Sequence, residues 1–409
     1  MSHRNSRGRA LIVGGSMSGL LAAIMLRRRD WEVEVFERVD SELAGRGAGI
    51  VAQPELIAHL DALGLDVRDL GVQITGRQLL DRDGRLAGAM TCPQVMTSWE
   101  RVYRILRKAF PPGRYHRGRG LKAFKQDASA IVTHFIDGEV AEGDLLIGAD
   151  GLRSTVRQQC LPVVEPLYAG YVAWRAMIPE SALPAAIRTE LFEAMTFCLP
   201  QGEQFLGYPV AGPDDDLRRG RRRYNIVWYR AADEATELRS LLTDDSGAYH
   251  PISIPPPLIR RNAIAAMRAA AERLLAPQLR EIVRLIDEPI LQPIYDLASP
   301  RLAFGRVAII GDAAFVARPH IAAGVSKAAD DAAALAAALQ IGDVKEGLRR
   351  YERERLPQGD RIIERARHLG AYLQATQNNV ARARSARHSI PEAVLAETAL
   401  LDFLYAPSP

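Results

Sequence analysis

Cysteines are scarce in this sequence, and long apolar runs are missing. Three of its 409 residues are cysteines, and Cys92, Cys160 and Cys198 lie far apart in the chain. This odd, scattered set predicts neither a disulfide framework nor a metal site, and it fits a reducing compartment. No apolar run is long enough to span a membrane, and the apolar stretch after the basic first residues is too short for a signal peptide. We therefore expect a cytoplasmic protein with no membrane partner.

The sequence also lacks an excess of charge of one sign. It has 53 Lys and Arg residues against 49 Asp and Glu, a formal net charge of +4. The densest basic run, residues 218–223, directly follows three aspartates at 214–216. This pattern is more typical of a solvated turn between strands than of an anion-binding patch. The composition therefore predicts no nucleic-acid partner, and the length allows two interlocked domains.

The order of strands and helices indicates a parallel sheet. An apolar strand at 9–13 runs into a glycine turn at 14–19, a helix over 20–29 and a second strand at 32–36. Such a βαβ unit joins parallel strands. A similar buried strand at 306–310 precedes a long alanine-rich helix almost at the other end of the chain. The two motifs predict one nucleotide-binding domain that is interrupted by a β-rich insertion.

The glycine turn has the features of a dinucleotide site. Gly14 allows the tight turn and Gly19 lets the helix pack closely on the sheet, so a diphosphate can lie over the helix N-terminus. Ser16 replaces the usual middle glycine, but it is small and adds a hydroxyl donor. Glu37 ends the second strand, where a carboxylate can accept hydrogen bonds from a free ribose, as in FAD or NAD. The expected contacts here are Gly14, Ser16, Met17, Ser18, Gly19, Glu37 and Arg38.

Two later segments complete a three-motif pattern. Asp150-Gly151 begins a D-G-x-x-S-x-x-R segment that ends at Arg157, after one buried strand, and Gly311-Asp312 follows another. Together with the glycine turn, these segments resemble the single-component FAD-dependent aromatic hydroxylases of the p-hydroxybenzoate hydroxylase group. The resemblance covers nearly the whole chain. It implies that FAD is the resident nucleotide.

The resemblance also implies further contacts with FAD. In the family, the D-G segment helps to hold FAD and the passing nicotinamide nucleotide, and the aspartate of the G-D segment lies on the ribityl chain. A glycine-rich crossing, here residues 45–50, lies near the flavin ring. The loop after Pro319 departs from the common G-x-G-x-N pattern at Ala322 and Ser326, but it keeps backbone amides for the ring. The residues implied are Arg46, Gly49, Ile50, Arg101, Asp150, Gly151, Asp312, Gly324 and Val325.

The implied reaction is hydroxylation of a small, electron-rich aromatic ring. The chain has a single dinucleotide fingerprint, so NADH or NADPH should visit the flavin only transiently. O2 would then form a C4a-hydroperoxyflavin, whose distal oxygen attacks the ring. Within the family the likeness is strongest to hydroxypyridine hydroxylases. The segments that carry it are Gln53-Pro54-Glu55-Leu56, Tyr168-Ala169-Gly170-Tyr171-Val172, Trp174-Arg175, Arg318-Pro319-His320, Lys327-Ala328 and Asp330-Asp331.

Three alternatives stay open at this point. The substrate could be an aromatic carboxylate of the hydroxynicotinate or salicylate type, which would need an arginine in the pocket. The chain could also be a nicotinamide-dependent dehydrogenase without flavin, or a flavin-binding protein without oxygenase turnover. Arg175 is a candidate for an anionic substrate, although we favour a surface arginine at the end of a strand. A homodimer is one assembly considered, and the sequence does not fix the subunit number.

Hydroxylation needs a base near the ring. His320 is the first candidate, because it follows Pro319 on the loop expected at the flavin, and imidazole titrates near neutrality. Tyr208 is the second candidate. In either position a residue that only hydrogen-bonds its surroundings is an equal alternative. The predicted catalytic residues are therefore His320, Tyr208 and Pro319, and the predicted substrate contacts are Phe197, Tyr208, Trp228 and His320.

The predicted fold class is α/β: a Rossmann-like FAD-binding domain, an interrupting β-sheet substrate domain and a helical C-terminus. The FAD-binding domain is expected in three pieces, 1–71, 99–166 and 291–340. The substrate domain is expected at 72–98 and 167–290. The C-terminal helices are expected at 341–409.

Overall fold

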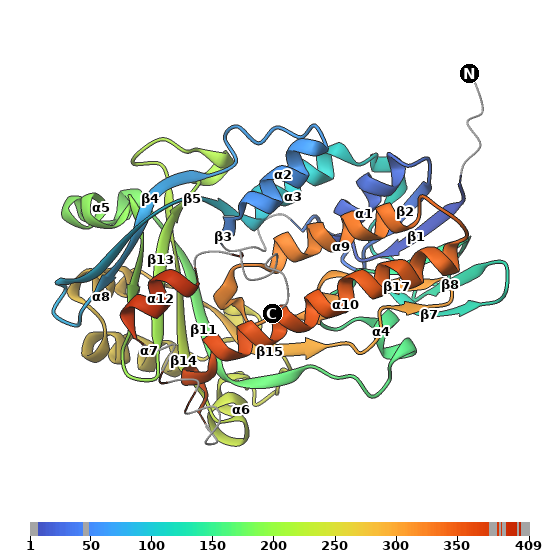
Figure 1. Cartoon of the computed structure of the whole chain (residues 1–409). Helices are drawn as coiled ribbons and strands as arrows, with labels where there is room; N and C mark the ends of the chain where they lie inside the picture. The colour runs from blue at the N-terminus through green and yellow to red at the C-terminus, as the bar shows by residue number, and fades with distance from the viewer. Residues whose placement is uncertain are drawn as a thin grey trace.

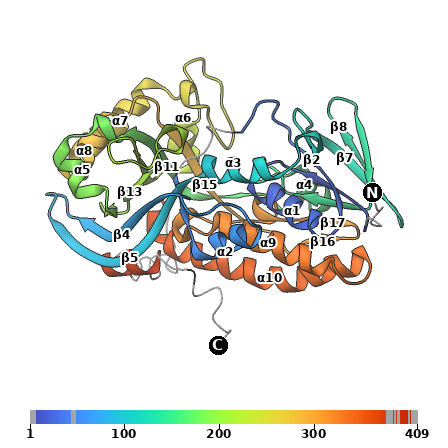
Figure 2. The same cartoon turned by 90° about the horizontal axis from the view of Figure 1, so that it is seen from above.

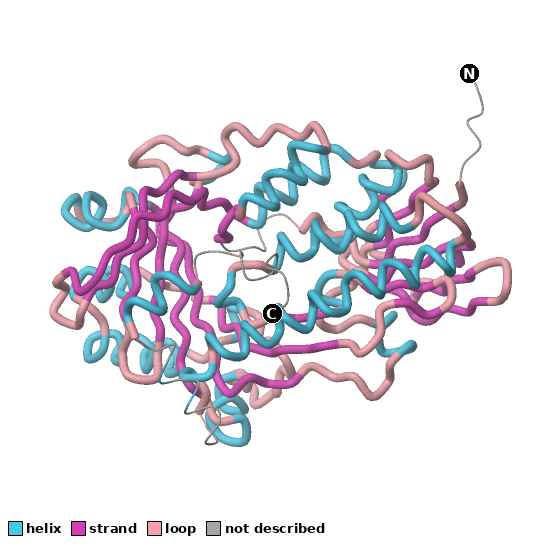
Figure 3. The backbone as a smooth tube through the Cα atoms, viewed as in Figure 1, coloured by secondary structure: helices cyan, strands magenta, loops and turns pink. Residues whose placement is uncertain are grey.

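The computed structural model describes residues 7–43, 49–375, 383, 386, 390–398 and 401. Its strands gather at two ends of the molecule, and long helices run between them (Figures 1 and 3). One end holds a mainly parallel sheet and the other holds a large mixed sheet. The predicted α/β class with a β-rich insertion is confirmed.

The six-stranded sheet is the nucleotide-binding end. Its order is β16 (Ala303–Phe304), β17 (Val307–Ile309), β10 (Leu145–Gly148), β1 (Arg9–Val13), β2 (Glu32–Phe36) and β6 (Tyr115–His116). All neighbouring pairs are parallel except β16 and β17. A separate three-stranded sheet is formed by β7 (Leu121–Gln126), β8 (Ile131–Phe135) and β9 (Val140–Gly143).

Helices from distant parts of the chain cover this end. The helix α1 (Met17–Arg27) packs against α9 (Gly324–Ala338), which in turn contacts α10 (Val344–Leu369). Because α1 begins at Met17 and not at residue 20, the turn is shorter than expected and the helix N-terminus lies directly after Ser16. The shorter helices of this end are α2 (Pro54–Ala62), α3 (Trp99–Ala109) and α4 (Thr155–Cys160).

The nine-stranded sheet forms the other end. Its order is β18 (Phe315–Val316), β15 (Ile290–Ala298), β11 (Leu167–Pro179), β14 (Arg223–Ala231), β13 (Gln204–Val210), β12 (Ala194–Cys198), β4 (Val72–Leu80), β5 (Leu86–Ser98) and β3 (Gly49–Ala52). The strands β3 and most of β15 lie in stretches that the sequence assigned to the FAD-binding domain. Strand pairing over long sequence distances nevertheless places both strands in this sheet.

One face of this sheet is buried under helices. Figure 2 shows α5 (Ala185–Leu191), α7 (Arg261–Leu274) and α8 (Pro277–Arg284) on this side. Their apolar side chains form a core with Trp174 and Trp228 from the sheet. Two further short helices are α6 (Arg239–Leu241) and α12 (Pro391–Glu397), and α12 contacts β4 and β5. In the described part of the chain, no helix has both the length and the apolar character that a membrane span requires.

Candidate active site

The glycine turn brings the end of β1 against the end of β10. Gly14 has a φ of +106°, and a Cβ there would lie 2.2 Å from the Ala149 carbonyl oxygen. A Cβ on Gly19 would lie 1.8 Å from the Gly14 oxygen. Ser16 is the N-cap of α1, but its side chain caps no helix N–H. The N-terminus of α1 therefore lies close to the sheet with N–H groups free for an anion.

Glu37 is held rigidly at the end of β2. Its two carboxylate oxygens accept hydrogen bonds from the Gly15 N–H at 2.8 Å and from the Val39 N–H at 2.9 Å. Each oxygen has a second lone pair, so the carboxylate can still accept bonds from ribose hydroxyls. The neighbouring Arg38 is exposed.

Hydrogen bonds within the D-G segment hold its shape. Asp150 accepts hydrogen bonds from the Thr155 N–H at 2.7 Å and from the Ser154 hydroxyl, and so caps α4. The fully buried Arg157 donates to the Ala313 carbonyl oxygen at 3.1 Å. The segment thus fixes the shape of the neighbouring Gly311–Ala313 turn. Gly151 lies in the cavity described below, whereas the Asp150 carboxylate is already used within the protein.

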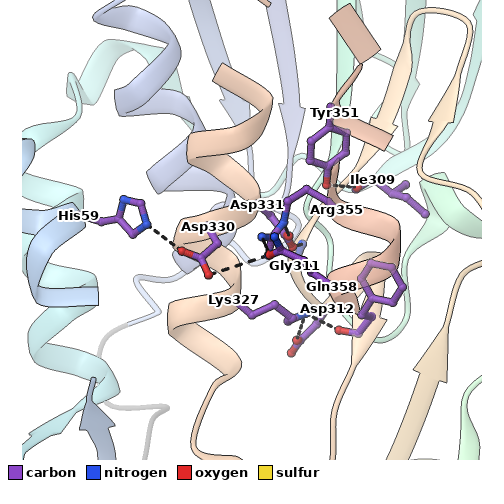
Figure 4. A network of polar contacts seen from close by, with 11 residues as sticks. His59, Ile309, Gly311, Asp312, Lys327, Asp330, Asp331, Tyr351, Arg355 and Gln358 are labelled. Atoms are coloured by element: carbon purple, nitrogen blue, oxygen red, sulfur yellow. Dashed lines mark hydrogen bonds and ion pairs between the residues drawn. The ribbon is translucent and has the colours of Figure 1, made fainter. Parts of the chain in front are cut away.

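A network of charged residues holds the G-D segment (Figure 4). Asp331 on α9 accepts from the Gly311 N–H at 2.9 Å and from Arg355 Nε on α10 at 2.8 Å. Lys327, only 1% exposed, lies with Nζ 3.4 Å from Asp312 Oδ1 and also donates to the Phe315 carbonyl oxygen. The Asp312 side chain itself is 57% exposed. Buried groups therefore fix the backbone of this turn and leave the Asp312 carboxylate open to the cavity.

A second contact ties this network to α2. His59 Nε2 on α2 lies 2.8 Å from Asp330 Oδ1 on α9. The helix α9 is thus held from α2 on one side and from α10 on the other.

A cavity of about 470 Å³ extends from the α1 turn to the open face of the nine-stranded sheet. It therefore connects the N-terminus of α1, which suits a diphosphate, with the face of the sheet, which suits an aromatic ring. Its walls include the α1 turn, the D-G and G-D segments, the loop that carries His320, and strands of the nine-stranded sheet, β3 among them. The residues of the earlier predictions that line it are Ser16, Met17, Ser18, Gly49, Ile50, Gly151, Phe197, Tyr208, Asp312, Pro319, His320, Gly324 and Val325.

Strand alternation decides which aromatic residues face the cavity. Phe197, Tyr208 and Tyr229 lie in its wall. Trp228 does not, so the structure does not bring this predicted substrate contact to the cavity. Side chains alternate along a strand, and Trp228 belongs to the opposite face, where it pairs with Trp174 and donates its indole N–H to Glu203 at 2.8 Å.

Tyr208 lies under the crossing strand β3. A Cβ on Gly49 would be 2.7 Å from Tyr208 Cε2, so only glycine allows this close approach. Gly49 also donates its N–H to Asn225 Oδ1 at 2.9 Å. Burial raises the pKa of Tyr208 to about 12, although the positive charge of Arg175 offsets part of the effect. The Tyr208 hydroxyl is therefore protonated near neutral pH.

His320 lies in the short turn Pro319–Ile321 and is 5% exposed. Its Nε2 is 2.7 Å from the hydroxyl oxygen of the buried Tyr171, whereas its buried Nδ1 has no hydrogen-bond partner in the described part of the chain. Burial, with a smaller contribution from the charge of Arg318, lowers the pKa of His320 to about 3. The imidazole is therefore neutral at physiological pH.

Arginines that the sequence did not place line the same cavity. Arg175 lies inside β11 and not at its end, and its side chain is part of the cavity wall, so the favoured surface position was wrong. Arg77 and Arg318 also line the cavity. Arg318 was visible as part of a motif, but no local signal marks Arg77 on an ordinary alternating strand.

Two of the arginines predicted to contact the cofactor are not brought to this cavity. Arg101 forms an ion pair with Asp215 at 3.4 Å and lies outside the cavity wall, where Trp99 at the start of α3 is found instead. Arg38 is exposed and also outside the wall. Arg46 lies outside the described residues.

Comparison with known proteins agrees with this geometry. Residues 168–296 match the family described as FAD binding domain-like, and residues 294–366 match the FAD binding domain family. The 2,6-dihydroxypyridine 3-monooxygenase of Paenarthrobacter nicotinovorans is 33% identical over 368 residues, which is 90% of this chain and 91% of that protein. The chain belongs to the FAD-dependent monooxygenases. It is an aromatic hydroxylase that binds FAD, and NADH or NADPH is the reductant of this family.

Other relatives support the same family. The 3-amino-4-hydroxybenzoate 2-monooxygenase of Streptomyces cremeus is 30% identical over 380 residues, 88% of this chain and 86% of that protein. The solved structure of 2,6-dihydroxypyridine-3-hydroxylase from Arthrobacter nicotinovorans superposes with a TM-score of 0.85 at 32% identity, over 92% of this chain and 96% of that one. Klebsiella pneumoniae HpxO, solved with FAD and uric acid, shares the fold with a TM-score of 0.75 at 21% identity, over 97% of this chain and 96% of that one.

Proposed function

We propose that this monooxygenase hydroxylates a hydroxypyridine ring with O2 and NADH or NADPH. The observation that carries the proposal is the cavity itself, which joins the α1 turn to a buried face with aromatic and polar side chains. The substrate of the relative that is 33% identical over 90% of the chain supports a hydroxypyridine in particular.

The residues of the cradle fit FAD. The free N-terminus of α1 suits the diphosphate, Glu37 suits the ribose, and the exposed carboxylate of Asp312 suits the ribityl hydroxyls. We assign the flavin ring to the region between Ile50 and the amides of Gly324 and Val325. When bound and reduced by the nicotinamide nucleotide, FAD supplies the activated oxygen for ring hydroxylation.

His320 is the group that we assign to the substrate proton. In its neutral form it can carry a proton on Nε2, donate it to the Tyr171 oxygen and keep a lone pair on Nδ1. The Nδ1 atom is then able to accept a hydrogen bond from a ring hydroxyl, which makes the ring more electron-rich. Pro319 fixes the backbone turn that carries His320. The protonated Tyr208 can donate a hydrogen bond to an oxygen of the same ring.

A second candidate function is hydroxylation of an aromatic carboxylate. Arg77 and Arg175 favour it, because both lie in the cavity wall and an aromatic carboxylate needs an arginine in its pocket. In this case one arginine would bind the carboxylate, and the ring would still lie between Phe197 and Tyr229.

A substrate panel tests the proposal. The purified holoenzyme should oxidise NADH or NADPH faster, and consume O2, when hydroxypyridines are added. Hydroxybenzoates and hydroxynicotinates form the comparison arm. Stimulation by the carboxylates alone would favour the second candidate, and no stimulation by any member of either set would refute both.

A further inference from the structure

Arg175 is unusual among the charged residues of the cavity. Its Nη1 donates to Gln292 Oε1 at 2.8 Å, and its Nη2 lies 3.5 Å from the Gly49 carbonyl oxygen. In the part of the chain that the structure describes, no carboxylate lies within 4.0 Å of the guanidinium. The Nε atom is buried and has no partner there either. The charge of Arg175 is thus not balanced by any described side chain.

The other two arginines of the wall are accounted for. Arg318 pairs with Asp296 at 2.9 Å. Arg77 has no carboxylate partner among the described residues, but its guanidinium donates to Gln94 at 3.0 Å, to the Thr398 hydroxyl at 2.7 Å and to backbone oxygens of the C-terminal segment. Burial lowers its pKa to about 10. Arg318 also keeps one donor without a partner, its Nη1, but its charge is paired with Asp296. Among these three arginines of the described wall, Arg175 alone combines an unpartnered donor with the lack of a carboxylate partner.

The surroundings of Arg175 are those of a ring pocket. Arg175 on β11 pairs with Val227 on β14. The same row of cross-strand neighbours continues through Leu206 on β13 to Phe197 on β12. Arg175 is half-buried, so water screens its charge less than it would on the open surface, and the described residues supply no counterion. A ligand that brings a negative charge to this point would gain a strong, two-pronged interaction.

The charge of Arg175 also acts across the floor of the cavity. Burial raises the pKa of both Tyr208 and Tyr229, and in each case Arg175 is the charge that offsets part of the increase. Since Tyr208 and Tyr229 both line the wall, an anion that lies between them feels the same field.

We propose that Arg175, oriented by Gln292, binds a negatively charged oxygen of the substrate, so that the enzyme selects aromatic substrates in their anionic form. The inference rests on the proposed function for the identity of the ring. The shared chemistry is an anionic oxygen on a small aromatic ring, either an ionised ring hydroxyl or a carboxylate. The planar fork of arginine suits both, because its two N–H groups can bind two oxygen lone pairs at once.

Binding to the oxidised holoenzyme, without reductant, tests the site. The dissociation constant is measured from the change in flavin absorbance for two pairs of probes. One pair is dihydroxypyridine and its dimethoxy counterpart, and the other is hydroxynicotinate and its amide. Each pair differs in the oxygen that can be negatively charged.

Arg175→Gln should weaken binding of the anionic member of one pair by at least about tenfold and leave its neutral counterpart unchanged. Arg175→Lys should fall between, because it keeps the charge but loses the fork. Weaker binding of dihydroxypyridine identifies an ionised ring hydroxyl as the anion that Arg175 binds, and weaker binding of hydroxynicotinate identifies a carboxylate. The matched control is Arg219→Gln, an 82% exposed arginine that pairs with Glu193 on the surface and should change nothing.

Equal affinities in Arg175→Gln and the unsubstituted enzyme would overturn the proposal, as would an equal loss for charged and neutral probes. If Arg175→Gln does not retain FAD, Arg175→Lys decides alone: weaker binding of one anionic probe with its neutral counterpart unchanged supports the site, and unchanged affinity for both anionic probes refutes it. Product analysis is separate. An enzyme that binds anions through Arg175 but hydroxylates no probe refutes the proposed reaction and not this site.

Discussion

Replacing His320 with glutamine should make the stability of the enzyme less dependent on pH. The folded protein holds His320 with a pKa of about 3, against 6.5 for an ordinary histidine. At pH values between these two, His320 binds a proton in the unfolded chain but not in the folded protein. The stability is thus fully present above about pH 6.5 and is lost as the pH falls towards 3.

The size of the effect follows from the same two values. Between about pH 7.5 and about pH 5, this single group should lower the free energy of unfolding by about 2 kcal/mol. Glutamine has no charged form, so His320→Gln should lose that part of the slope. Its amide N–H can also still donate a hydrogen bond to the Tyr171 oxygen, which limits other damage.

Urea unfolding with excess FAD at several pH values measures this difference. The control is His134→Gln on β8, far from the cavity, which should keep the slope of the unsubstituted protein. Slopes for His320→Gln and the unsubstituted protein that agree to within about 0.5 kcal/mol over this range would show that His320 is not held in a neutral form. That result would remove the basis for its role at Nδ1.

The remaining two predictions concern FAD binding. Gly19→Ala should weaken FAD binding by more than about tenfold, because a Cβ would lie 1.8 Å from the Gly14 oxygen and push α1 off the sheet. Gly113→Ala, where a Cβ meets nothing within 4 Å, is its control, and equal FAD affinity of both variants would contradict this account. Lys327→Met should weaken FAD binding by about tenfold, since it removes the ammonium that holds Asp312. Flavin fluorescence titration measures both, and an unchanged affinity in Lys327→Met would show that Lys327 does not position Asp312.

Local patterns were sufficient for the first βαβ unit of the nucleotide end. The strand β1, the glycine turn and β2 follow each other in the sequence, so spacing alone predicts their arrangement. The turn residues Gly14 and Gly19 are forced by close backbone contacts that any such turn must make.

The ring end depends on contacts between distant segments. The hydroxyl of Tyr171 and the His320 ring lie 149 residues apart in the sequence, and no local pattern connects them. Alternation shows that Trp228 and Tyr229 face opposite sides, but not which side holds the cavity. The position of Arg175 in the cavity wall could not be predicted for the same reason, because the wall forms only when β11 pairs with the distant strands β14 and β15.

The fate of molecular oxygen tests the proposed reaction most directly. Holoenzyme, NADH or NADPH and dihydroxypyridine are incubated under isotopically labelled O2, and the product is analysed by mass spectrometry. The account predicts a ring that has gained one oxygen atom carrying the label, with one nicotinamide nucleotide oxidised per product. Oxidation of the nucleotide with hydrogen peroxide as the only oxygen product, for every aromatic ring tried, would contradict it.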